Sequence, residues 1–137
     1  MRAKTVDMQK GEENMEYQMK YPLSQNKRET GTAYELKAEE YLLGNGYKLL
    51  ERNFRNRSGE IDLIVKKDGQ IHFVEVKYRT TAMYGSPLEA VGFRKQNQIR
   101  KVAMYYLMKN KLSEWTPCQF DVIAFEGEKM THLENAF

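Results

Sequence analysis

The feature that most constrains the fold is a pair of apolar segments that carry charged residues and are joined by a turn signal. Residues 59–64 and 73–77 are rich in β-branched and aromatic side chains, as strands are. Asp68-Gly69 between them is typical of a two-residue hairpin turn. The sequence therefore predicts two antiparallel strands, and each carboxylate within them requires a physical explanation.

Counting outward from the turn predicts which residues face each other. With Asp68 and Gly69 in the loop, Lys67 pairs with Gln70 and Asp62 lies opposite Glu75. A three-residue turn would shift this register by one residue and separate the two carboxylates. Because side chains alternate, one face is predicted to carry Asp62, Ile64, Phe73, Glu75 and Lys77, and the other Ile61, Leu63, Val65, Val74 and Val76.

Two facing carboxylates need a positive partner. Directly opposed residues have Cβ atoms about 4.5–5.5 Å apart, and like charges at that separation are destabilising. Mg²⁺ is one candidate, since it is held by one or two carboxylates together with water and substrate phosphates. The alternative is a solvated sheet end at which Asp62 and Glu75 pair with Lys77, Lys48 or an arginine, and the hairpin alone leaves both open.

Composition limits the class of protein. A chain of 137 residues predicts one principal domain, and its net charge of +3 permits nucleic-acid binding without demonstrating it. Cys118 is the only cysteine, which excludes an internal disulfide and a cysteine-based zinc cluster. No apolar run reaches the roughly 18 residues that span a bilayer. We expect a cytoplasmic protein that does not contact a membrane.

The order of elements predicts an α/β fold. Residues 1–28 lack periodicity and are expected to form a flexible extension, and 29–137 the domain. The first helix is expected over 32–43, and a second from the capping sequence Ser86-Pro87-Leu88-Glu89 to Lys109. Strands are expected at 47–54, at the two hairpin segments, at 119–125 and, as a short edge strand, at 129–133, which gives the order α-β-β-β-α-β.

Two charged side chains fall on the apolar stripes of these helices. Glu35 lies within the arc that also holds Ala38 and Leu42, although Thr32-x-x-Glu35 has the spacing of a capping box. Lys95 lies in the middle of the second stripe, where a lysine must extend to solvent or find a partner. A functional role toward the sheet and these structural explanations both remain open.

Basic residues surround the charged hairpin in the sequence. A cluster precedes its first strand, one arginine follows Lys77, and others lie on the second helix. Such groups can hold a phosphate backbone, although a run of charge is more often a solvated face. The candidates for nucleic-acid contact are Arg52, Arg55, Arg57, Arg79, Arg94 and Lys95.

A series of motifs gives the chain a family resemblance that covers nearly everything after residue 30. It includes Gly31-x-x-x-Glu35, Arg52-Asn53-Phe54-Arg55, Gly59-Glu60-Ile61-Asp62, Glu75-Val76-Lys77, Tyr84-Gly85-Ser86-Pro87, Val91-x-x-x-Lys95 and Phe120-Asp121-Val122. In these motifs the chain resembles the YraN family of small bacterial proteins. That family in turn resembles the PD-(D/E)XK nucleases, which include restriction endonucleases and archaeal Holliday-junction resolvases.

The resemblance implies a three-layer core with a mixed sheet flanked by helices, and a site for Mg²⁺ or Mn²⁺. Asp62, Glu75 and Lys77 match the D…E-x-K signature, Glu35 matches the acidic residue of the first helix and Lys95 the lysine of the second. The Val76 carbonyl is then a further metal ligand. The implied activity is hydrolysis of phosphodiester bonds in DNA, including branched or damaged DNA. The alternative is a nucleic-acid-binding or protein-interaction module without catalysis, and the sequence allows a homodimer without identifying an interface.

Overall fold

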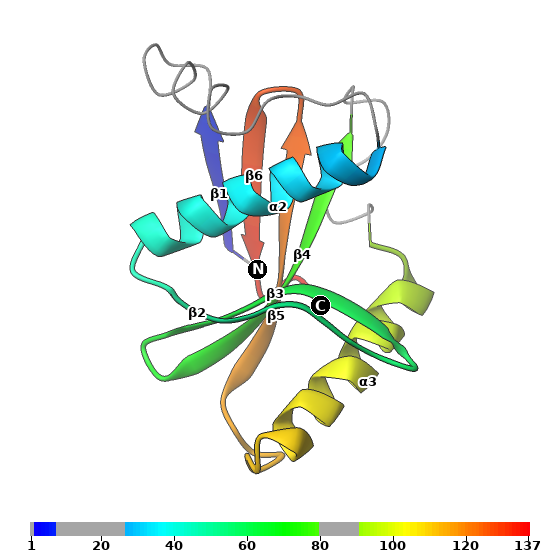
Figure 1. The fold of residues 1–137 in the computed structure, drawn as a ribbon. Coiled ribbons are helices and arrows are strands. Elements are labelled where there is room, and N and C mark those ends of the chain that lie inside the picture. Colours follow the sequence, from blue (N-terminus) through cyan, green and yellow to red (C-terminus); the bar gives the residue numbers. More distant parts are fainter. Residues whose placement is uncertain (1, 8–26, 80–90) are drawn as a thin grey trace.

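A six-stranded mixed sheet lies between two helices in the computed structural model, which describes residues 2–7, 27–79 and 91–137 (Figure 1). The strand order is β1-β6-β5-β4-β3-β2, and within it only β4 and β5 run parallel. The predicted α/β class with helices on both faces of a mixed sheet is confirmed. The elements are β1 (Arg2–Asp7), α2 (Lys27–Gly44), β2 (Lys48–Asn56), β3 (Gly59–Lys67), β4 (Gln70–Arg79), α3 (Phe93–Lys109), β5 (Cys118–Glu126) and β6 (Lys129–Glu134).

The β3–β4 hairpin has the predicted register. Lys67 pairs with Gln70, and the ladder continues to Leu63 opposite Val74. Asp68 and Gly69 have φ values of 51° and 77°, as a type I′ turn requires at both central positions. The turn therefore holds the strands so that Asp62 and Glu75 follow directly on the last paired residues.

The core consists of two apolar clusters, one on each face of the sheet. Residues of α3, including Ile99 and Val102, pack with Ile64 and Phe73, while Ala38 and Leu42 of α2 pack on the opposite face. Leu63, Val65 and Val74 lie on the α2 side as predicted. Ile61 does not, because it packs on the α3 side beyond the point where the β3–β4 ladder ends.

The first helix starts earlier than the sequence analysis predicted. It begins at Lys27 rather than at Thr32, so Thr32 and Glu35 lie inside the helix and the capping-box interpretation of Glu35 is wrong. Its end is as predicted, since Gly46 has a φ of 86° and the amides of Asn45 and Tyr47 donate to the Leu42 carbonyl. Across the described residues, neither helix is long and apolar enough to cross a membrane.

The second helix is shorter than predicted. It ends at Lys109 as expected but begins at Phe93, after Gly92 in extended conformation without a side-chain cap. The predicted cap Ser86-Pro87-Leu88-Glu89 lies outside the described residues, as does most of the expected loop from Arg79 to Gly85. The Gly92 backbone, at φ −69° and ψ 166°, is non-helical and sets the helix start at the following residue.

The N-terminal segment contains a strand that the sequence analysis did not predict. Residues 2–7 form β1, which pairs antiparallel with β6 from Arg2 opposite Glu134 to Asp7 opposite Lys129. The expectation of a flexible extension is therefore wrong for these residues, and 8–26 lie outside the described residues. The free backbone groups of β6 provide the reason, because they can pair with a segment of weak intrinsic preference. The predicted strand at 129–133 is confirmed, but β1 covers its outer side.

A buried hydrogen-bonded network ties β4, β5 and β6 together. Asp121 is fully buried, and its Oδ2 lies 2.9 Å from His72 Nδ1 and 2.9 Å from His132 Nε2. Its Oδ1 accepts from the Asn135 amide at 3.0 Å and from Gln119 Nε2 at 2.9 Å. Burial opposes its ionisation, but these four donors outweigh it and hold the pKa of Asp121 well below its usual range.

We predict that Asp121→Asn destabilises the fold by about 3–5 kcal/mol, because an amide cannot accept all four hydrogen bonds in this buried place. The matched control is Asp68→Asn in the exposed turn, where asparagine is equally suitable. Since the pKa of Asp121 is lowered on folding, its stabilisation is present above about pH 4 and is lost as the pH falls further. Chemical denaturation at pH 3 and pH 7 measures both effects. Equal unfolding free energies for Asp121→Asn and the native chain would contradict this role.

Candidate active site

Asp62 and Glu75 come together where the β3–β4 ladder ends. The backbone amide of Val76 donates to Asp62 Oδ2 at 2.8 Å, which fixes the Asp62 side chain against β4. Asp62 is in hydrogen-bonding reach of Glu75, and the two carboxyl groups interact electrostatically. Glu75 is only 5% exposed. The register brings the two residues near each other, since each follows directly on the last paired residues, Leu63 and Val74.

Two lysines from different elements face this carboxylate pair. Lys77 Nζ lies 3.7 Å from Glu75 Oε1, two residues along β4 on the same side. Lys95, from the first turns of α3, interacts electrostatically with both Asp62 and Glu75. The charge that interrupts the apolar stripe of α3 is therefore directed toward the sheet end. Both lysines lower the pKa of Glu75 but do not outweigh its burial.

Glu35 reaches the same place from α2. It is in hydrogen-bonding reach of Asp62, and Asp62 and Glu60 both raise its pKa. Asn53, in the amide orientation that satisfies its neighbours, donates to Glu60 Oε1 at 3.1 Å and to Glu35 Oε2 at 3.2 Å. A small cleft of about 60 Å³ opens between α2, β2 and β3 and is lined in part by Glu35, Asn53 and Asp62.

Sequence reasoning missed Asn53 and Glu60. Asn53 has a φ of 47°, a left-handed backbone that asparagine tolerates better than most residues. The register places Glu60 beside Arg55, with which it forms an ion pair at 3.2 Å. The motif Arg52-Asn53-Phe54-Arg55 contained the signal, because it sets a polar amide between two arginines at the start of the charged hairpin.

The pKa values of the cluster show an excess of buried negative charge. Burial raises the pKa of Glu75 to about 8, and the Asp62 charge raises it further in the same direction. Burial also raises the pKa of Glu35 to about 7, again with a contribution from Asp62. Burial raises the pKa of Asp62 as well, although the hydrogen bond from the Val76 amide lowers it. Carboxylates that resist ionisation at neutral pH are characteristic of a site that binds a cation or transfers protons.

The donor set fits a divalent cation. Glu75 Oε2 is buried, and no described residue donates a hydrogen bond to it. Once Glu75 is ionised, this oxygen is a buried acceptor without a donor, which is costly unless something else satisfies it. Carboxylate oxygens from Glu75, Asp62 and Glu35 are hard ligands of the kind that Mg²⁺ and Mn²⁺ prefer. The Val76 amide is already bonded to Asp62, and the predicted ligand role of the Val76 carbonyl remains a prediction.

The basic residues expected to contact nucleic acid differ in their surroundings. Arg52 is bonded to the buried Glu39, with its Nη2 3.1 Å from Glu39 Oε2, and it lines the small cleft. Arg79 is paired with Glu126, whereas Arg57 and Arg94 are exposed. Of these arginines, the structure therefore places Arg52 beside Asp62. Nucleic-acid contact by any of them remains a prediction.

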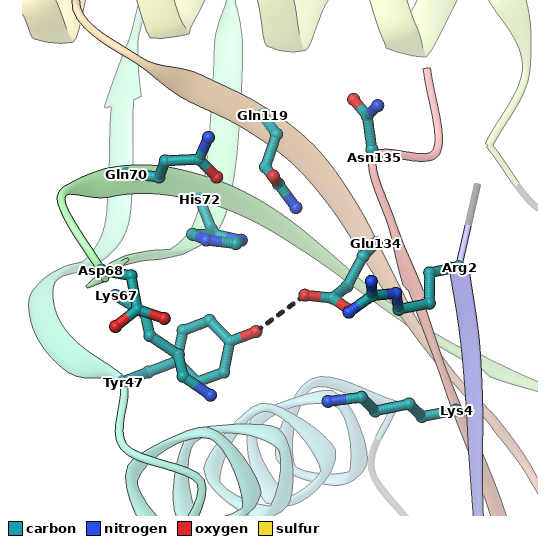
Figure 2. Close-up of a pocket in the computed structure, with 10 residues that line it drawn as sticks. All are labelled: Arg2, Lys4, Tyr47, Lys67, Asp68, Gln70, His72, Gln119, Glu134 and Asn135. Atoms are coloured by element: carbon teal, nitrogen blue, oxygen red, sulfur yellow. Dashed lines mark hydrogen bonds between the residues drawn. The ribbon is translucent and has the colours of Figure 1, made fainter.

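A larger pocket lies at the opposite end of the β3–β4 hairpin, and sequence reasoning did not predict it. It has a volume of about 530 Å³ and contains His72, Tyr47 and Glu134 among its lining residues (Figure 2). Donor atoms of His72, Asp121 and Glu134 lie within 4.8 Å of one another, so by proximity alone this cluster could hold a metal ion. The available signal was Asp121, a carboxylate within the apolar strand 119–125.

We predict that Glu75→Gln stabilises the metal-free protein at alkaline pH. Because the pKa of Glu75 is raised from its ordinary value of 4.5 to about 8, the folded protein retains a proton that the unfolded chain releases. The contribution of Glu75 to the free energy of unfolding therefore decreases as the pH rises through this range. In the presence of a chelator, the variant should be more stable than the native chain at pH 8.5 by on the order of 1–3 kcal/mol, with little difference at pH 4.

Chemical denaturation across this pH range is the measurement, and Glu114→Gln, at an exposed glutamate of the same type, is the control. The control should follow the native profile. A Glu75→Gln profile that ran parallel to the native one would show that Glu75 does not hold the retained proton.

Comparison with known proteins assigns the family. Residues 34–125 match the uncharacterised protein family UPF0102. A UPF0102 protein of Lachnoclostridium phytofermentans is 46% identical over 112 residues, which cover 82% of this chain and 95% of that protein. One from Photobacterium profundum is 49% identical over 77% of this chain and 86% of its own length, and one from Clostridioides difficile is 45% identical over 82% and 99%. The chain thus belongs to UPF0102, the YraN family that its motifs resemble.

Proposed function

We propose that the protein is an endonuclease that depends on Mg²⁺ or Mn²⁺ and hydrolyses phosphodiester bonds in DNA, including branched or damaged DNA. The observation that carries the proposal is the pair formed by the half-buried Asp62 and the buried Glu75, with an unbonded carboxylate oxygen and two lysines beside it. An ion-pair cluster alone explains this less well, because Lys77 Nζ lies 3.7 Å from Glu75 Oε1 and Glu75 Oε2 has no donor among the described residues.

Asp62, Glu75 and Glu35 would hold the cation. When bound, such an ion activates water for attack and offsets the charge that develops on the phosphate. Asp62 is preorganised for this role because the Val76 amide fixes one of its oxygens. Glu75 contributes the oxygen that has no donor among the described residues. The ligands come from α2, β3 and β4, so the fold itself sets their spacing.

The two lysines would act on the substrate from the α3 side of the carboxylate pair. Lys77 is close enough to Glu75 to be held in place and can orient the attacking water or stabilise the negative charge of the transition state. Lys95 comes from another element and can contact the scissile phosphate or its neighbour. Their separate origins suit an extended phosphate backbone that contacts both the first turns of α3 and the end of β4.

A second candidate is a module that binds nucleic acid or protein without catalysis. The observation that favours protein binding is a set of large apolar side chains exposed on and after α3, including Met108, 67% exposed, and Trp115, 84% exposed. Exposed apolar side chains of this size are common at interaction surfaces. This candidate explains the surface of α3 but gives no role to the Asp62–Glu75 pair.

We predict cleavage of DNA in the presence of Mg²⁺ or Mn²⁺ that Asp62→Asn and Glu75→Gln each reduce by at least about 100-fold, because each removes a charged ligand. Lys77→Ala should reduce the rate by about 100-fold as well. Single-stranded, duplex and four-way-junction DNA are the substrates, and binding is measured separately in Ca²⁺ or a chelator. Glu114→Gln and Lys66→Gln, at exposed positions away from the site, should cleave normally.

Cleavage that survives both carboxylate substitutions would overturn the site assignment. If no substrate is cleaved while DNA binding persists, the non-catalytic module is favoured. Thermal denaturation gives an independent result. Mn²⁺ should raise the melting temperature of the native chain and of Glu114→Gln, but not the melting temperature of Asp62→Asn. At a Mn²⁺ concentration of 100 times the dissociation constant, the free energy of unfolding should increase by about 2.7 kcal/mol.

A further inference from the structure

The second pocket is separate from the proposed nuclease site. It lies at the turn end of the β3–β4 hairpin, whereas Asp62 and Glu75 lie beyond the other end of the ladder. Its volume of about 530 Å³ falls within the range of about 300–1,000 Å³ typical of small-molecule pockets. Figure 2 shows that its lining side chains come from strands at both margins of the hollow, with Arg2 and Lys4 on β1 facing Lys67 and Tyr47.

His72 is a buried side chain that presents one nitrogen to this pocket. It is 4% exposed, and its Nδ1 lies 2.9 Å from Asp121 Oδ2. Because the pKa of Asp121 is held well below its usual range, that oxygen accepts, and Nδ1 carries the proton. Since His72 lines the pocket and its Nδ1 is bonded to Asp121, Nε2 is the ring nitrogen left to bind a ligand there. Among the described residues, none hydrogen-bonds to this Nε2.

The same hydrogen bonds argue against a metal ion at Asp121. Each of its oxygens already receives two donors, so the carboxylate has no free lone pair for a cation. His132 Nε2 must donate to Asp121, which leaves His132 Nδ1 to accept from the Tyr41 hydroxyl at 3.0 Å. The close approach of His72, Asp121 and Glu134 is therefore explained by a hydrogen-bonded network that positions His72.

The lining charge favours an anion. Three cationic side chains, Arg2, Lys4 and Lys67, face the hollow. Two acidic residues, Glu134 and Asp68, also line the pocket. Glu134 Oε1 already accepts a hydrogen bond from the Tyr47 hydroxyl at 3.1 Å. The Lys67 ammonium lies 4.8 Å from the centre of the Tyr47 ring, which holds it at the pocket wall. The remaining polar lining is formed by the amides of Gln70, Gln119 and Asn135.

We propose that this pocket binds a phosphate monoester, either as a free nucleotide or as the phosphorylated end of an oligonucleotide. A phosphate monoester carries about −1.5 to −2 charges at pH 7, which suits a pocket lined by three cations and two carboxylates, one of which is already hydrogen-bonded to Tyr47. The hollow exceeds what a phosphate group alone requires, and its amides can hydrogen-bond to an attached sugar or base. His72 acts as a positioned hydrogen-bonding partner, since Asp121 fixes the orientation of its ring.

Isothermal titration calorimetry of the full chain with dAMP, deoxyadenosine, inorganic phosphate and Zn²⁺ tests the proposal. We expect dAMP and phosphate to bind and deoxyadenosine to bind at least tenfold more weakly, because only the phosphate can form charged hydrogen bonds with the lining cations. Comparing short oligonucleotides with a 5′-phosphate and a 5′-hydroxyl distinguishes the two sources of the phosphate. Tighter binding of the phosphorylated end than of dAMP assigns the site to nucleic acid, and the reverse assigns it to a free nucleotide.

Lys67→Gln and Lys4→Gln should each weaken dAMP binding about tenfold or more. Lys66→Gln is the matched control, because it removes the same charge from the adjacent, exposed position that does not line the pocket. Asp62→Asn should leave dAMP binding unchanged, which separates this site from the proposed nuclease site. Three results would each overturn the proposal. They are equal binding of dAMP and deoxyadenosine, equal effects of Lys66→Gln and Lys67→Gln on dAMP binding, and binding of Zn²⁺ without phosphate.

Discussion

The interaction on which the proposed active site depends is the close approach of two carboxylates, one buried and one half-buried, at the end of a hairpin ladder. Asp62 and Glu75 are brought together by a turn that fixes the register and by the Val76 amide that holds Asp62 in place. Like charges in such a place are unfavourable, and the fold offsets them only in part, through Lys77 and Lys95. The raised pKa of Glu75 is the physical sign that the compensation is incomplete.

The layered architecture explains why charge from several parts of the chain meets at this point. The sheet places β4 in the middle with β3 beside it, α2 covers one face with Ala38 and Leu42, and α3 covers the other with Ile99 and Val102 (Figure 1). Glu35 and Lys95 lie on the inner stripes of these helices and so reach the same sheet end from opposite layers. The parallel pairing of β4 with β5 also brings together His72 of β4 and Asp121 of β5, away from this site.

The sequence predicted the hairpin, its register and the α/β class because these follow from local turn chemistry and strict alternation. It failed where the determining contact is distant. The pairing of residues 2–7 with β6 depends on a free strand edge more than a hundred residues away, and Ile61 changes sides where the ladder ends. Asn53 and Glu60 joined the site through side-chain contacts that a pattern cannot show. His72 and Asp121 escaped because their pairing needs the β4–β5 crossover.

A crystal structure with Mn²⁺, with anomalous diffraction measured at the manganese edge, distinguishes a cation site from an ion-pair network at Asp62 and Glu75. We predict an anomalous peak between the carboxylates of Asp62 and Glu75 that is lost in crystals of Glu75→Gln. This prediction would be contradicted by crystals at pH 8 that show no peak there while the Lys77 or Lys95 ammonium lies between the two carboxylates. That result would make the pair part of a structural ion-pair network.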